Sequence, residues 1–164
     1  MQVIGQHRGG GGTEAHDSGF SVIELVLVLL VIAITAAIAA PRYGDALARF
    51  RADAAARRVA NDLALVQARA RSTGTSCAVN FDISANRYQL PGESDFKRSG
   101  TTYTVDLAGD PYYASMGTAV FGATSVVTFN GFGVPSNAGY VRLSVGKAVR
   151  TISIDADNGV ATVQ

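Results

Sequence analysis

A long apolar run near the N-terminus constrains the fold more than any other feature. Residues 20–40 are 21 residues with a single charged side chain, Glu24. As an α-helix this run would be about 31 Å long, close to the roughly 30 Å hydrocarbon thickness of a bilayer. A helix without a polar face must be covered on all sides, and a chain of 164 residues is too small to bury one. We therefore predict that residues 20–40 span a membrane.

A secretory signal peptide is an alternative interpretation of this run. The small residues of Ala37–Ala39 match the cleavage motif of such peptides. Against it, the apolar part is long, and Glu24 stands where the basic region of a signal peptide should end. Arg8 is the only Lys or Arg of residues 1–19. The balance favours a permanent membrane helix.

An amphipathic helix follows the run. Residues 52–70 carry small and apolar side chains at spacings of three and four, which is typical of one buried helix face. These residues are Ala52, Ala55, Val59, Leu63, Val66 and Ala70. Pro41 and Gly44 can bend a helix without ending it. We therefore expect one long, kinked helix from Phe20 to about Ser72, with a solvated arginine face.

Beyond Gly74 the apolar period changes to two, which predicts strands that are buried on one side. A hairpin is predicted from 77–82 and 87–90, followed by strands near 103–107, 126–129, 141–145, 152–154 and 160–164. Asn158 and Gly159 predict a two-residue hairpin turn with positive φ at both positions. Long loops are expected at 91–100 and 130–139. The predicted fold class is α+β, a long N-terminal membrane-spanning helix followed by an antiparallel β-sandwich.

The residue inventory lacks a catalytic set. The only histidines, His7 and His16, lie in a glycine-rich stretch, and Cys77 is the single cysteine. No glycine-rich loop leads from a strand into a helix. Asp155 and Asp157 suit a turn better than a calcium loop, because the rest of such a loop is missing. We therefore expect no enzyme activity, no cofactor and no metal site.

Glu24 poses a chemical problem inside an apolar helix. A charged side chain costs about 2.5–3.5 kcal/mol at the bilayer centre and less near a helix end. No Lys, Arg or His lies within one helical turn of Glu24. A cut between Gly19 and Phe20 would create an α-ammonium group that is positive at neutral pH. This cation could pair with Glu24 on the same chain or on a neighbour.

The sequence GFSVIEL, at residues 19–25, together with the apolar run resembles the class III signal of type IV pilins and of type II secretion pseudopilins. The resemblance implies cleavage after Gly19 by the prepilin peptidase, and N-methylation of Phe20. It also implies that Glu24 is the assembly glutamate, whose carboxylate meets the N-terminal amine of an adjacent subunit.

The remainder is similar to GspH and FimT type minor subunits, through ADAAARRVANDLALVQARARSTGTSCAVNFD from Ala52 and the closing strands from Thr128. A pilin-like fold of GspH type is implied. The expected domains are a prepilin leader at 1–19, a transmembrane part at 20–40, an amphipathic helical stem at 41–72 and a β-sandwich at 73–164.

The function that this resemblance implies is structural. The chain is expected to be a minor pseudopilin of the type II secretion pseudopilus, at or near its tip, that helps to start filament assembly. Its partners would be the prepilin peptidase, other pseudopilins or pilins, the inner membrane and exported proteins. The chain would cross the bacterial inner membrane once, with its C-terminal domain in the periplasm. Charge counting opposes this orientation, because residues 41–72 hold seven arginines against three aspartates.

The alternative function is that of a DNA-binding minor type IV pilin, similar to FimT, that serves DNA uptake. Arg142, Lys147 and Arg150 would form its contact if adjacent strands brought them together. Residues 72–164 hold six basic side chains against seven acidic ones, and residues 155–164 hold two acids and no base. Phosphate neutralisation therefore lacks a source, and nucleic acid is not an expected partner.

Overall fold

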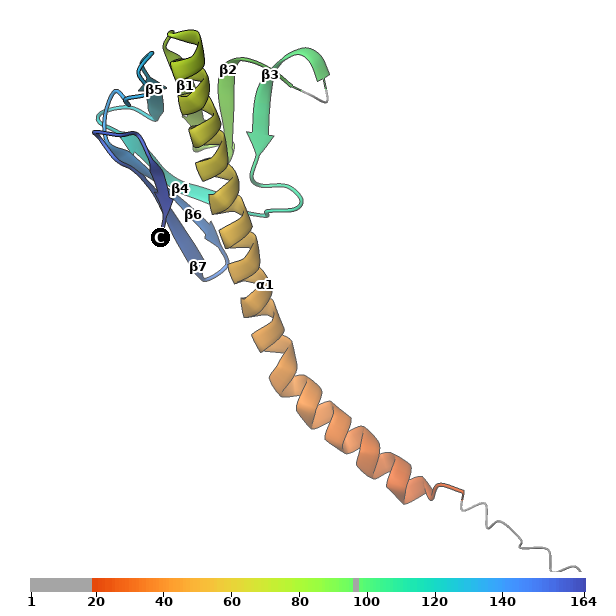
Figure 1. The fold of residues 1–164 in the computed structure, drawn as a ribbon. Coiled ribbons are helices and arrows are strands. Elements are labelled where there is room, and N and C mark those ends of the chain that lie inside the picture. The colour runs from red at the N-terminus through yellow and green to blue at the C-terminus, as the bar shows by residue number, and fades with distance from the viewer. Residues whose placement is uncertain (1–18, 96–97) are drawn as a thin grey trace, which may run out of the picture. The chain divides into compact units, whose positions relative to one another are not determined.

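The computed structural model describes residues 19–95 and 98–164, which form one helix and two antiparallel sheets (Figure 1). The helix α1 spans Val22–Thr73. The strands are β1 (Cys77–Asp82), β2 (Arg87–Asp95), β3 (Arg98–Asp106), β4 (Ser115–Phe121), β5 (Val126–Phe129), β6 (Gly139–Val145), β7 (Ala148–Ile154) and β8 (Ala161–Val163). The predicted α+β class is confirmed.

The chain divides into two compact units, the first ending at Ala39 and the second beginning at Ala40. The described part of the first unit is the start of α1, and all its side chains are exposed. Its most apolar 18-residue window has a mean hydropathy of 2.9. By length and composition this segment can cross a membrane. The helix assignment continues through Pro41, as the sequence predicted.

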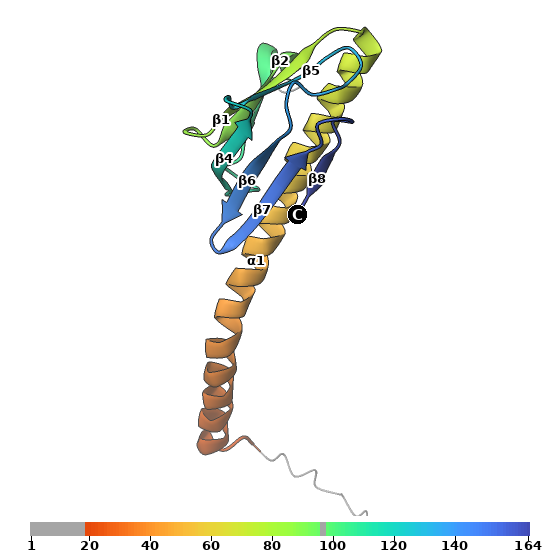
Figure 2. The ribbon, with the colours of Figure 1, turned by 90° about the vertical axis from the view of Figure 1, so that its left-hand side faces the viewer.

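The second unit pairs its strands in the orders β3-β2-β1-β5 and β4-β6-β7-β8, with every neighbouring pair antiparallel. Within this unit α1 lies against the two sheets, as Figures 1 and 2 show from perpendicular directions. The predicted helix stripe is entirely buried, at Ala52, Ala55, Val59, Leu63, Val66 and Ala70. Helix and both sheets therefore share one core.

The strand β4 was missed by the sequence analysis. Its buried residues are Met116, Ala119 and Phe121, so the spacing between the first two is three rather than two. The pairing with β6 shifts register between Met116 and Thr118, which indicates a bulge. One extra residue breaks the alternation that reveals a strand.

The predicted loop at 91–100 was wrong where the structure describes it. β2 continues to Asp95 and β3 begins at Arg98, with Ser94 opposite Thr102 after a register shift beyond Leu90. Gly92, within this irregular stretch, has a φ of 87°, which other residues rarely adopt. Residues 96–97 lie outside the described part. The loop predicted at 130–139 is confirmed for residues 130–138.

The connection from β7 to β8 is longer than the predicted two-residue turn. Asp155 Oδ1 accepts hydrogen bonds from the backbone N–H groups of Asp157 and Asn158, at 2.9 and 3.1 Å. Gly159 N–H then donates to the carbonyl of Asp155 at 3.0 Å. Only Gly159 has a positive φ, of 71°. The aspartate side chain thus holds a wider loop, in which Asn158 keeps a negative φ.

A buried carboxylate ties α1 to the sheet that contains β2 and β3. Asp62 is 6% exposed and accepts from Tyr88 Oη at 2.6 Å, from Arg58 Nε at 3.1 Å and from Tyr103 Oη at 3.4 Å. Burial and the adjacent Asp62 carboxylate raise the pKa of the Tyr88 hydroxyl, which therefore stays protonated as a donor. Arg58 also donates to Tyr103. This network fixes the helix against two strands.

We predict that Asp62→Ala lowers the free energy of unfolding by about 2–4 kcal/mol, because the Tyr88 hydroxyl would stay buried without an acceptor. Thermal unfolding of the detergent-solubilised chain, followed by the tyrosine signal in near-UV circular dichroism, measures the change. The control is Asp157→Ala, which removes an exposed carboxylate and should change stability by less than about 0.5 kcal/mol. Equal stability of the two variants would contradict the role of the Asp62 network.

Candidate assembly and membrane surfaces

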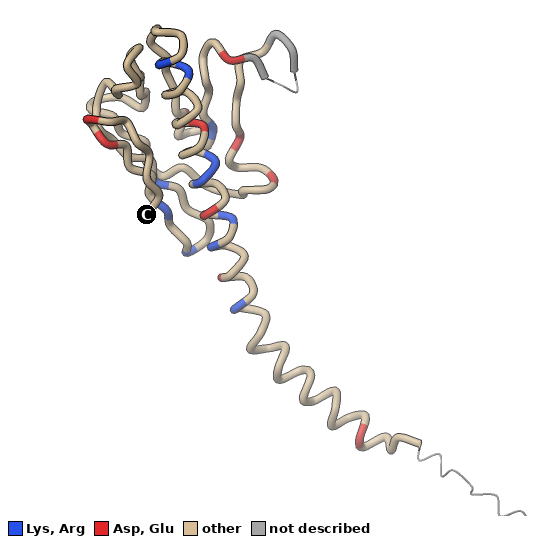
Figure 3. The backbone as a smooth tube through the Cα atoms, in the orientation of Figure 1, with Lys and Arg blue, Asp and Glu red and all other residues tan. Residues whose placement is uncertain are grey.

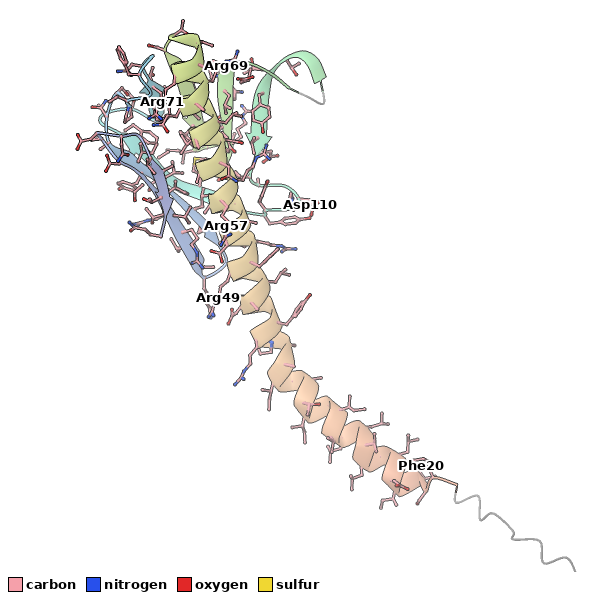
Figure 4. All side chains as sticks on the ribbon, in the orientation of Figure 1. Phe20, Arg49, Arg57, Arg69, Arg71 and Asp110 are labelled. Carbon is pink, nitrogen blue, oxygen red and sulfur yellow. The ribbon has the colours of Figure 1, made fainter. Side chains whose placement is uncertain are left out.

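The predicted processing site lies just before α1. Gly19 and Phe20 are outside the helix, and Phe20 is 81% exposed (Figure 4). A Cβ atom added at Gly19 would meet nothing within 4 Å. The fold therefore does not require glycine at this position. The Gly19–Phe20 peptide bond is accessible, as a peptidase substrate must be.

Glu24 occupies the first turn of α1. The carbonyl of Ser21 accepts from the N–H groups of Glu24 and Leu25, at 3.0 and 3.1 Å, so Ser21 caps the helix. Glu24 follows this cap by three residues, but its carboxylate has no hydrogen-bond or ion-pair partner among residues 19–95 and 98–164, so the side-chain bonds of a capping box are not formed. The free N–H groups at the helix N-terminus favour an anion there.

This local stabilisation of Glu24 was missed by the sequence analysis, which searched only for a basic side chain. The signal was the position of Glu24 in the first turn of the predicted helix, where backbone N–H groups are free. A helix terminus contributes about 0.3–1 kcal/mol to an exposed carboxylate. This stabilisation is smaller than the cost of placing a charge in hydrocarbon. A cation that pairs with Glu24 would therefore stabilise it further.

The apolar part of α1 presents side chains in all directions. Its large apolar side chains, from Phe20 to Ile38, are each at least 44% exposed. Water is a poor solvent for a continuous surface of this kind. The segment therefore suits lipid, or the apolar helices of neighbouring subunits.

Four of the seven arginines of α1 have partners inside the second unit. Arg58 binds Asp62, and Arg69 forms an ion pair with Glu93. The Arg51 guanidinium carbon lies 4.6 Å from the centre of the Tyr113 ring.

Arg71 Nε donates to the carbonyl of Phe132 at 3.1 Å. Arg42, Arg49 and Arg57 are exposed and have no hydrogen bond, ion pair or ring contact with any described residue. The fold thus separates arginines with a structural partner from arginines that are free for external contacts (Figure 4).

Arg142 and Arg150 do not share a surface. Arg142 is exposed and lies opposite Thr151 in the β6–β7 ladder, whereas Arg150 lies opposite the buried Leu143. Because paired residues share a sheet face and neighbours along a strand alternate, the two arginines point to opposite faces. Arg150 forms an ion pair with Asp53 of α1.

Lys147 lies in the turn between β6 and β7, beside Asp45, Ala48 and Arg49 of α1. The three basic residues of the DNA-binding alternative are therefore spread over two faces and a turn. They do not form the single patch that this alternative would need.

Gln67 holds the far end of α1 to two loops. Its Nε2 donates to the carbonyls of Gly133 at 2.7 Å and of Asn158 at 2.6 Å. Asn130 Oδ1 accepts from the N–H groups of Phe132 and Val134, both at 3.0 Å. This bonding fixes the 130–138 loop, which presents Phe132 with 84% of its surface exposed. Sequence reasoning had no signal for Gln67, because its acceptors are distant backbone carbonyls.

Comparison with protein families gives one match. The model of the family described as type II transport protein GspH matches residues 55–158, more than half of the chain. The match covers α1 from Ala55, the strands β1 to β7 and most of the following loop. No curated protein and no solved structure matches the chain.

Proposed function

Because the chain belongs to the GspH family of type II transport proteins, we propose that it is a minor pseudopilin at or near the tip of a type II secretion pseudopilus. GspH proteins are structural pseudopilins, and they assemble with other pseudopilins in that filament. The observation that carries the proposal is an uncovered apolar helix at the N-terminus of a GspH domain. Such a helix fits a single-pass membrane anchor.

The proposed order of segments follows from this function. Residues 1–19 are a leader, 20–40 the membrane span, 41–72 the stem and 73–164 the exported domain. The division of the chain between Ala39 and Ala40 supports a boundary near the end of the apolar run. The chain sits in the bacterial inner membrane before assembly, with the GspH domain in the periplasm. Exported proteins and the tip pseudopilins would contact this domain.

The first step of the proposed function is maturation of the chain. The prepilin peptidase cleaves between Gly19 and Phe20, and the new Phe20 nitrogen is methylated. The exposed, non-helical backbone at this bond supports such cleavage. The released α-ammonium places a cation four residues before Glu24, at the same end of the helix. A methylated amine remains positive at neutral pH.

We predict that Gly19→Val abolishes cleavage while the chain still inserts into the membrane. A side chain at position 19 meets nothing in the fold, so a loss of processing would report what the peptidase requires. Intact-mass spectrometry of the membrane fraction should show wild-type chains that begin at methylated Phe20, and variant chains that retain Gly19. The matched control is Gly44→Ala, also at a glycine without neighbours within 4 Å, which should be processed normally. Wild-type chains in assembled filaments that retain residues 1–19 would refute the proposed maturation.

Assembly is the second step. The Glu24 carboxylate pairs with the N-terminal amine of an adjacent subunit, so that two charges leave water together. A neighbour that slips by one helical turn would leave Glu24 unpaired in an apolar bundle. The pairing thereby sets the register of the packed helices. Its strength comes from the low dielectric of the surroundings.

We predict that Glu24→Ala and Glu24→Gln both reduce incorporation into filaments at least about tenfold, because each variant leaves the N-terminal ammonium of the neighbouring subunit without its partner. A tenfold change corresponds to about 1.4 kcal/mol, which is less than the cost of about 2.5 kcal/mol for a charge at the bilayer centre. Glutamine keeps the length and polarity of the glutamate side chain but carries no charge. The two variants together therefore separate the loss of charge from the loss of side-chain volume. The measurement is the fraction of the subunit recovered in sheared filaments, with alkaline extraction confirming membrane insertion. Normal incorporation of Glu24→Gln would show that the charge is dispensable.

A further inference from the structure

The arginines that lack partners are not spread evenly along α1. Arg42 and Arg49 are the first two basic residues after the apolar run, and they lie two and nine residues beyond Ala40. They are seven positions apart, which places them on the same face of the helix within about 20°. Both side chains are exposed and make no hydrogen bond, ion pair or ring contact with another described residue. This end of the domain therefore carries uncompensated positive charge.

The fold adds a third basic residue to this face. The turn between β6 and β7 packs against α1, where a Cβ atom on Gly146 would lie 3.8 Å from the Ala48 Cβ. Lys147 in this turn lines a small hollow together with Asp45, Ala48 and Arg49. Residues from opposite parts of the sequence thus meet beside the start of the domain (Figure 3). We call Arg42, Arg49 and Lys147 the basic cluster.

The charges within the basic cluster do not cancel. Asp45 is the one acidic residue in the hollow, and neither Arg49 nor Lys147 forms an ion pair with it. Three cations thus stand against one anion, for a net charge of about +2. The neighbouring Asp53 is already engaged by Arg150. An anion from outside the chain would neutralise the positive charge that remains on the basic cluster.

We propose that the basic cluster binds the anionic headgroups of phospholipids at the surface of the membrane in which the apolar helix is anchored. This inference rests on the membrane anchor of the proposed function. The polar layer of a leaflet is about 5–8 Å thick outside the hydrocarbon core. Arg42 lies about 3 Å beyond Ala40 along the helix, and Arg49 about 14 Å.

Side-chain direction favours the same contact. Helical Cα–Cβ bonds tilt toward the helix N-terminus, so Arg42 and Arg49 lean toward the end where the apolar run joins. Their long side chains extend further in that direction, with the guanidinium group at the tip. An anionic surface attracts the basic side chains near it, and salt weakens this attraction. The cluster would hold the unassembled domain close to the bilayer.

The test uses the mature full-length chain in nanodiscs of phosphatidylcholine alone, or of phosphatidylcholine and phosphatidylglycerol in equal amounts. The chain has two lysines, Lys97 and Lys147, which simplifies the readout. The acylation rate of each lysine by a water-soluble succinimidyl ester is measured by peptide mass spectrometry. An ammonium group held against lipid phosphate is shielded and reacts slowly. Lys97 serves as the internal reference for reagent strength.

We expect Lys147 to react about fivefold more slowly in the anionic discs at low salt, which is the equivalent of about 1 kcal/mol. High salt should restore the rate seen in phosphatidylcholine discs. Arg42→Gln/Arg49→Gln should reduce the slowing to less than about twofold, because Lys147 alone attracts the surface weakly. The matched control, Arg57→Gln/Arg142→Gln, removes two exposed arginines without partners that lie outside the cluster. It should leave the slowing unchanged.

Several outcomes would overturn the inference. These are equal Lys147 rates in the two kinds of disc, or equal effects of the two double variants. Inorganic phosphate that slows Lys147 in phosphatidylcholine discs as strongly would indicate a site for small anions instead. Slowing by duplex DNA but not by anionic lipid would favour nucleic acid. A chain that does not stay with the discs would contradict the membrane anchor, and this inference with it, whereas a retained chain with unchanged rates contradicts this inference alone.

Discussion

The close packing of α1 on two sheets is the constraint on which the second unit depends. The helix presents small side chains at Ala52, Ala55, Ala56 and Ala70, all fully buried. Val59, Leu63 and Val66 on the same helix face are also buried. A strand or helix with one apolar face must bury that face against another element. Here α1 and both sheets bury their apolar faces in one shared core, in which Phe81 of β1 stacks on Phe121 of β4, so neither sheet has an independent core.

Polar contacts fix the position of the helix on that apolar surface. Apolar packing alone would tolerate some sliding, whereas Asp62 must meet Tyr88 and Gln67 must meet two backbone carbonyls. Each buried polar group is costly if its partner is displaced. The Asp53–Arg150 pair adds a tie to β7, so that α1 is bound to both sheets.

The sequence predicted the features that follow from periodicity and missed those that depend on distant partners. The period of 3.6 placed the helix stripe correctly, and the period of two located β1, β5, β6 and β7. β4 escaped because a bulge interrupts its alternation. No sequence signal pointed to Asp62 or Gln67, since the acceptors of Gln67 lie 66 and 91 positions further along the chain. The motif at Gly19 and Glu24 was visible without the fold, because it is a local stretch of sequence.

The distribution of arginine partners also bears on membrane orientation. Counting basic residues beside a membrane helix treats every arginine after the run as equally free to oppose translocation. In the folded domain Arg51, Arg58, Arg69 and Arg71 are held by internal partners. These four arginines therefore have a role in the folded domain whichever side of the membrane it occupies, so their number alone does not assign the domain to the cytoplasm. Only the arginines without internal partners remain for external contacts. Of the two nearest the apolar run, Arg49 lies beside Lys147, and Arg42 lies on the same helix face as Arg49. The anionic surface of either leaflet would attract both arginines.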